Sequence, residues 1–153
     1  MAEIVLRDEL ARAGLAGAVS VESAGTGDWH VGERMHGPAQ DELARRGYDG
    51  SQHRARQIQP SWLASCDLLV AMDRKNLASL RRMAPAQDAA RIQLLRSFDP
   101  ELATDDPYDA EVPDPYGAPQ EYYALALDLV LAGARGLAGQ LAELLDAAPQ
   151  PRA

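Results

Sequence analysis

The run from Asp67 to Met72 constrains the fold more than any other stretch of this chain. It carries four consecutive apolar residues, Leu68-Leu69-Val70-Ala71. A strand with one solvated face would alternate apolar and polar residues, whereas an uninterrupted run is typical of a strand covered on both faces. The sequence therefore predicts a strand over 67–72 in a sheet that has other elements packed against each side.

The rest of the chain supplies elements of both kinds. Apolar periodicity, with proline at helix starts and glycine at helix stops, predicts helices over 1–13, 38–46, 60–65, 74–83 and 120–145. Alternation over 18–23 and an apolar segment over 92–95 predict two more strands. Helices that alternate with strands indicate an α/β fold with a parallel sheet. We expect one domain over 1–146 and a frayed, proline-bearing tail over 147–153.

The last predicted helix carries most of the remaining apolar residues. At helical spacing one face is shared by Tyr122, Leu125, Leu129, Gly133, Leu137, Leu141 and Leu144. Gly133, Gly136 and Gly139 would let its backbone lie close to a sheet.

Charge and cysteine content exclude several classes of function. A net charge of −8 argues against nucleic acid and against an anionic membrane surface as partners, although a small phosphorylated ligand stays compatible with it. The single cysteine, Cys66, rules out an intramolecular disulfide and a CxxC metal site. No stretch approaches the roughly 18 apolar residues of a membrane span, and no secretory signal is visible. We expect a cytoplasmic protein without cofactor or metal.

The segment from Val112 to Gly117 holds one carboxylate between two prolines. Pro113 and Pro115 restrict the backbone on either side of Asp114, and Gly117 permits a tight exit. An acid held so rigidly, with the ring of Tyr116 two residues later, suits a proton donor for an aromatic substrate. The same residues also suit an ordinary proline-rich β-turn. The segment alone leaves both interpretations open.

Five segments, in this order along the chain, resemble the low-molecular-weight protein tyrosine phosphatases. They are Met1-Ala2-Glu3, Ser23-Ala24-Gly25-Thr26, Ser51-x-His53-x-Ala55-Arg56-Gln57, Ala71-Met72-Asp73-Arg74-x-Asn76-Leu77 and Asp114-Pro115-Tyr116. The resemblance implies a doubly wound sheet of four parallel strands flanked by helices, with the active site at the carboxyl ends of the strands. One departure is Met35-His36-Gly37-Pro38, where many members read Met-Asp-Pro-Arg. It concerns a loop and puts no chemical role in doubt.

The resemblance also assigns roles to five residues. Asp114 is implied to be the acid that protonates the departing tyrosine oxygen, and Trp29 and Tyr116 to wall the substrate ring. Ser23 and His53 are implied to brace the phosphate-binding loop by hydrogen bonds. Without the resemblance, Ser23 would be interpreted as a strand-end polar group and His53 as a solvated loop histidine. The substrate implied is a phosphotyrosine protein or a small aryl phosphate.

One part of the family pattern does not occur between Met1 and Ala153. In the family a Cys-x5-Arg-Ser loop, between the first strand and a helix that begins Ser-Pro-Met-Ala-Glu, supplies the nucleophile and the phosphate-binding arginine. Cys66 cannot substitute, because Met72 stands where the arginine is needed, and a buried, inert thiol is expected there. The first, central strand is missing as well, so three strands are expected.

Two explanations of this gap stay open. In the first, an internal methionine was taken as the start and the functional protein begins upstream; in the second, the chain is a natural pseudo-enzyme. In either case we expect residues 1–153 to be inactive as written. The competing function is a non-catalytic relic that binds a partner through the surface of Trp29 and Tyr116. Arsenate reduction is discounted, because it needs further cysteines besides Cys66.

Overall fold

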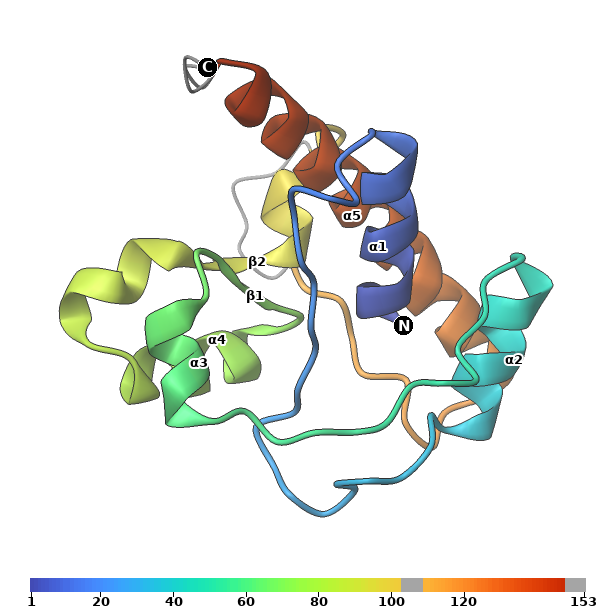
Figure 1. Ribbon diagram of the computed structural model, residues 1–153. Coiled ribbons are helices and arrows are strands. Elements are labelled where there is room, and N and C mark those ends of the chain that lie inside the picture. Colours follow the sequence, from blue (N-terminus) through green and yellow to red (C-terminus); the bar gives the residue numbers. More distant parts are fainter. Residues whose placement is uncertain (103–108, 148–153) are drawn as a thin grey trace.

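The structure is a computed structural model that describes residues 1–102 and 109–147. A long C-terminal helix runs along one side of the molecule, and short helices and two strands make up the rest (Figure 1). In chain order the elements are α1 (Ala2–Arg12), α2 (Gly37–Arg45), α3 (Pro60–Ser65), β1 (Leu69–Ala71), α4 (Arg74–Met83), η1 (Ala86–Arg91), β2 (Ile92–Leu94), η2 (Leu95–Phe98) and α5 (Gln120–Ala147).

The sheet consists of β1 and β2, which pair in parallel with Leu69 opposite Ile92. Side chains of the run over 68–72 alternate between two hydrophobic clusters. Leu69 and Ala71 pack with α3, α4 and β2, whereas Leu68, Val70 and Met72 pack against the cluster formed by α1, α2, η2 and α5. The apolar run is therefore covered on both faces, which confirms the α/β fold with a parallel sheet flanked by helices.

The prediction of a strand over 18–23 is wrong. The segment forms no ladder, so the sheet has two strands among the described residues instead of the expected three. A strand exists only where a neighbour accepts and donates its backbone hydrogen bonds. Here the carbonyl of Val21 accepts from the guanidinium of Arg7, and the first regular backbone contact is the isolated bridge between Gly25 and Gln57.

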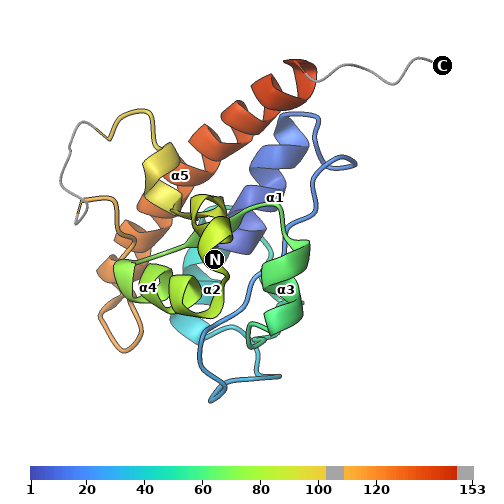
Figure 2. The same cartoon turned by 90° about the vertical axis from the view of Figure 1, so that its left-hand side faces the viewer.

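α5 is the helix against which α1, α2 and η2 pack. α1 and η2 lie along it, and Figure 2 shows α1 following its course. Gly133 and Gly136 permit this close approach, because a Cβ atom would lie 2.6 Å from the carbonyl oxygen of Leu95 at the first position and 1.8 Å from that of Phe98 at the second. The glycines thus bring α5 against η2 and not, as predicted, against a sheet, and Gly139 faces open space.

The face that α5 buries agrees with the predicted one at Gly133 and Leu137 and differs from it towards the two ends of the helix. Tyr123, Ala126, Leu127 and Val130 are buried, whereas Tyr122, Leu125 and Leu144 are exposed. α5 is also apolar and long enough, by composition, to resemble a membrane span, so the prediction that no stretch approaches one was too strict. Its buried residues pack against α1, α2 and η2, which accounts for the apolar composition.

The predicted domain and tail meet near the end of α5. The helix continues to Ala147, one residue into the predicted tail. The remainder of that tail, 148–153, lies outside the described residues.

The close contact of α5 with η2 gives the first prediction. Gly136→Ala should destabilise the protein by about 1–3 kcal/mol, since the added methyl group meets a backbone carbonyl that cannot turn away. Gly139→Ala is the matched control on the same helix and should stabilise it by about 0.5–1 kcal/mol. Urea unfolding followed by circular dichroism measures both. Equal stability of the two variants would show that the close approach of α5 and η2 is wrong.

Candidate functional site

A cavity of about 410 Å³ opens beyond the carboxyl end of β1. Four of the five predicted site residues, Ser23, Trp29, His53 and Asp114, contribute to its wall. The other residues of the wall are Ala24, Gly25, Thr26, Gly27, His30, Val31, Ala55, Arg56 and Asn76. Segments that are distant in sequence therefore meet at one site. It lies beyond the carboxyl end of a strand, where the family resemblance implies the active site.

The loop that carries Asp114 is attached to the end of β1. The backbone N–H of Val112 donates to the carbonyl of Met72 at 2.7 Å. One residue earlier, a carboxylate oxygen of Glu111 accepts from both the backbone N–H and the Nε of Arg74, at 3.0 and 2.9 Å. The acid loop is therefore positioned by the residues that connect β1 to α4.

Asp114 is part of a turn and also lines the cavity. Its Oδ1 accepts from the backbone N–H of Tyr116 at 3.0 Å, the hydrogen bond of an Asx-turn. Gly117 follows with a φ of 76°, a conformation that glycine adopts without strain. The two interpretations of the segment are thus compatible, because the turn holds one carboxylate oxygen and leaves the side chain exposed at the cavity.

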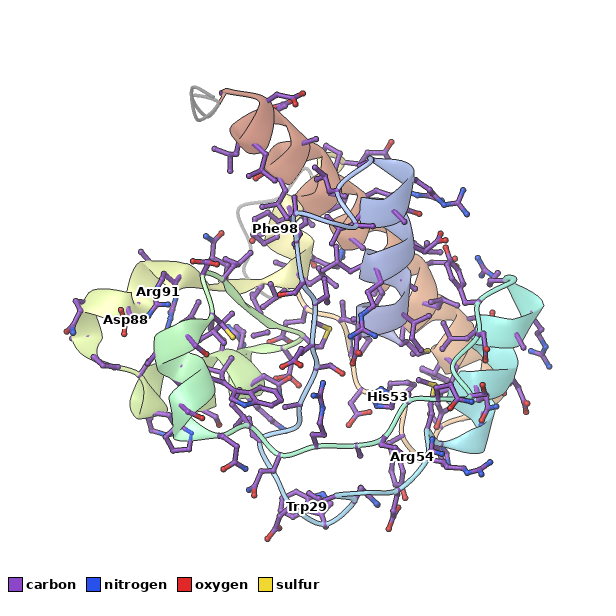
Figure 3. The ribbon with its side chains drawn as sticks, in the orientation of Figure 1. Trp29, His53, Arg54, Asp88, Arg91 and Phe98 are labelled. Atoms are coloured by element: carbon purple, nitrogen blue, oxygen red, sulfur yellow. The ribbon has the colours of Figure 1, made fainter. Side chains whose placement is uncertain are left out.

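Backbone hydrogen bonds attach the loop of Trp29 to the segment after His53. Gly25 donates to Arg56 at 2.8 Å, and Gly32 donates to Ala55 at 2.9 Å. Trp29 is 77% exposed, and Figure 3 shows it at the edge of the molecule, outside His53. Its ring lies on the backbone of Gly27, where a Cβ atom would come within 2.4 Å of it.

Tyr116 lies at the rim and not among the residues of the cavity wall. It is 61% exposed, and its ring contacts His30, which does line the cavity, at a centroid distance of 5.6 Å. The ring of His36 lies closer, at 4.8 Å. The sequence analysis gave no role to either histidine.

Ser23 and His53 both face the carboxylate of Glu3 in the first turn of α1. The hydroxyl of Ser23 donates to it, and Nδ1 of His53 lies 3.5 Å from the same oxygen. Arg7 lies 2.8 Å from the other carboxylate oxygen. The sequence analysis assigned no role to Glu3. Its place in the Met1-Ala2-Glu3 match was the one available signal.

The charge state of His53 depends on these surroundings. Burial lowers the pKa of His53, and the positive charges of the amino terminus, Arg56 and Arg54 act in the same direction. The carboxylate of Glu3 opposes them. A histidine kept neutral can accept one hydrogen bond and donate another, which suits a bracing role.

Cys66 does not contribute to the cavity. It follows α3, and its carbonyl accepts from the guanidinium of Arg91, which also donates to the carbonyl of Leu63 at 3.1 Å. The thiol residue is half-buried, so the expectation of a buried cysteine is corrected. Across 1–102 and 109–147, no group of three or more His, Cys, Asp or Glu side chains could hold a metal ion.

The site thus combines a carboxyl group with an aromatic side chain. Asp114 can give or take a proton at the cavity wall, and Trp29 offers a flat, exposed ring. Arg56 adds a positive charge to the same wall. No cysteine lines the cavity.

Comparisons with known proteins agree with this arrangement. The sequence model described as low molecular weight phosphotyrosine protein phosphatase matches residues 1–147. A low molecular weight protein-tyrosine-phosphatase of Streptomyces coelicolor is 43% identical over 147 residues, which are 95% of this chain and 87% of that protein. Low molecular weight protein-tyrosine phosphatase A of Mycobacterium tuberculosis is 44% identical over 116 residues, 76% of this chain and 67% of that protein.

Solved structures give the same answer. A protein tyrosine phosphatase from Entamoeba histolytica superposes with a TM-score of 0.85 at 25% identity, over 94% of this chain and 88% of that one. YfkJ from Bacillus subtilis superposes with a TM-score of 0.82 at 32% identity, over 94% and 86% of the two chains. Sequence and fold therefore agree over nearly the whole length, and the chain belongs to the low molecular weight phosphotyrosine protein phosphatase family.

Proposed function

We propose that this site acts in the hydrolysis of phosphotyrosine or other aryl phosphates, with Asp114 as the proton donor. One observation carries the proposal: Asp114 and Trp29, from distant parts of the sequence, line the same cavity. Trp29 and Tyr116 would contact the faces and edge of the substrate ring. Ser23 and His53, through Glu3, would support the phosphate-binding loop.

The reaction would take two steps. A cysteine thiolate attacks phosphorus and the P–O bond to the aryl group breaks, while Asp114 gives its proton to the departing oxygen. Asp114, now ionised, then takes a proton from water as that water attacks phosphorus. Inorganic phosphate leaves and the thiolate is regenerated. The route needs a cysteine and an arginine in a phosphate-binding loop, and Cys66 fits neither the position nor the spacing.

The substrate is defined by its ring and its phosphate. Exposed aromatic side chains favour a phosphotyrosine protein or a small aryl phosphate over an alkyl phosphate. The net charge of −8 disfavours nucleic acid and an anionic membrane. We place the activity in the cytoplasm, where a thiolate nucleophile stays reduced.

The first prediction from the proposed function concerns residues 1–153 alone. The purified protein should not hydrolyse p-nitrophenyl phosphate above the buffer rate. Residues 1–153 contain neither the cysteine that would attack phosphorus nor the arginine that would position the phosphate in a Cys-x5-Arg-Ser loop. A version with a strand and a Cys-x5-Arg-Ser loop joined ahead of Met1 should be active. Release of nitrophenolate, followed by absorbance, measures both proteins.

This prediction has a specific control. Cys66→Ser should change nothing in either protein, since Cys66 lies outside the cavity. Turnover by residues 1–153 that survives Cys66→Ser, but is lost in Asp114→Asn, would mean that a nucleophile within these residues has been overlooked.

The second prediction concerns Asp114 in the version that carries the loop. General acid catalysis contributes typically ~10²–10⁴-fold, and the contribution is larger for leaving groups that need the proton more. Tyrosine has a pKa of about 10, well above that of nitrophenol, so its oxygen needs the proton more. Asp114→Asn should therefore slow cleavage of phosphotyrosine much more than cleavage of p-nitrophenyl phosphate. Single-turnover rates with the two substrates measure the difference.

Tyr116→Ala provides the contrast. It should weaken binding of both substrates about equally, because each presents an aromatic face. If Asp114→Asn slows both substrates by the same factor, Asp114 only holds the turn and the assignment of the acid is wrong.

A further inference from the structure

Tyr116 is held on the protein side by two imidazole rings. His36 lies 4.8 Å from it between centroids and His30 lies 5.6 Å from it, with interplanar angles of 39° and 43°. These tilted arrangements are within the range of favourable ring pairs. Tyr116 itself is largely exposed, so these contacts define where its ring points.

The two histidines differ in how firmly they are fixed. Nδ1 of His30 lies 2.9 Å from a carboxylate oxygen of Glu33, but both side chains are exposed. Exposed pairs of this kind contribute little to stability, so this contact fixes the ring of His30 only weakly. Nδ1 of His36 lies 2.9 Å from the hydroxyl of Tyr123, which is only 2% exposed. A buried hydroxyl without a partner is costly, so this hydrogen bond resists breaking.

Tyr123 belongs to the rigid part of the molecule. It lies in the first turns of α5 and packs into the core there. Gln120, on the same helix, donates to the carbonyl of Pro38 at 3.1 Å and thereby fixes the start of α2, where His36 is the N-cap residue. The side chain of His36 makes no capping bond. Its ring is thus free to bond Tyr123 on one side and to contact Tyr116 on the other.

We propose that His36 is a positioning residue for Tyr116, and that Tyr123 fixes the orientation of His36. The proposal rests on the proposed function, in which Tyr116 contacts the substrate ring. The effect reaches the acid as well, because the backbone N–H of Tyr116 donates to Asp114. The core of α5 is thereby connected to the loop of Asp114 through the rings of Tyr123, His36 and Tyr116 and through two hydrogen bonds.

The position of His36 supports this reading. In the sequence analysis, Met35-His36-Gly37-Pro38 departs from the Met-Asp-Pro-Arg of many family members and was judged to affect only a loop. The structure places His36 between a core hydroxyl and the rim of the cavity. An aspartate at this place would supply no ring for Tyr116 to contact.

The first test observes Tyr116 directly, without catalysis. Residues 1–153 labelled with 3-fluorotyrosine are studied by ¹⁹F NMR, and the resonance of Tyr116 is assigned from Tyr116→Phe. His36→Ala and Tyr123→Phe should each move this resonance towards the value of a freely exposed tyrosine, because Tyr116 loses its fixed neighbour. Tyr122→Phe is the matched control, since its side chain is half exposed beside Tyr123, and it should leave the resonance in place.

The second test is a double-mutant cycle on KM in the version that carries the Cys-x5-Arg-Ser loop. His36→Ala should raise KM for aryl phosphates about 2- to 10-fold, the change expected when one aromatic contact of ordinary strength is lost. Combined with Tyr116→Ala, it should add little further, because His36 acts through Tyr116. Fully additive effects would overturn the proposal.

The two tests separate the proposal from the function on which it rests. If that version shows no turnover, the proposed function fails while the NMR test still decides how Tyr116 is held. If the resonance of Tyr116 is unchanged in His36→Ala, with circular dichroism and melting temperature retained, His36 does not position Tyr116. His36 is exposed, so this variant stays informative even where loss of the buried hydroxyl of Tyr123 prevents folding.

Discussion

The burial of β1 on both faces is the constraint on which the site depends. Its side chains alternate between two hydrophobic clusters, so the strand cannot shift by one residue without exchanging its two sets of contacts. The residues that follow it are consequently fixed in space. The carbonyl of Met72 accepts a hydrogen bond from the backbone N–H of Val112. The side chain of Asp73 caps α4 by accepting from the backbone N–H of Asn76 at 2.6 Å. One short strand thereby places both the acid loop and the helix that borders the cavity.

Much of this fold could be predicted from local signals. Helix limits at proline and glycine, and the apolar run over 68–71, depend on residues near each other in sequence. The prediction of a strand over 18–23 failed for the opposite reason. Alternation of apolar and polar residues shows only that a segment is compatible with a strand, whereas its pairing depends on neighbours that are distant in sequence. The predicted face of α5 failed at the start of the helix for a similar reason. Tyr122 and Tyr123 suit a buried site equally by composition, and only the contact of this part of α5 with the α2 region selects Tyr123.

The residues of the site also divide into those that the sequence could predict and those that only the folded chain shows. The family resemblance pointed to Ser23, Trp29, His53 and Asp114, and the structure brings these four to one cavity. It assigned no role to the residues that support them, although Glu3 lies within one of the matching segments. The contacts of Glu3 with His53 and of His36 with Tyr123 join parts of the chain that are far apart in sequence. Such contacts have no periodicity and no motif of their own, so they become visible only once the chain is folded.

The acidity of the chain has to be reconciled with an anionic substrate. Its charge of −8 repels a phosphate at long range, but salt screens that repulsion beyond about 8 Å at physiological ionic strength. Within the cavity the local composition differs, because Arg56 lines the wall and its guanidinium is oriented by stacking on Trp62 at 5.0 Å. The aromatic contacts of Trp29 and Tyr116 carry no charge and are unaffected by the net value. In the function we propose, recognition would therefore depend on ring contacts and on a few local charges, and the overall charge would disfavour polyanions such as nucleic acids more than a single phosphate.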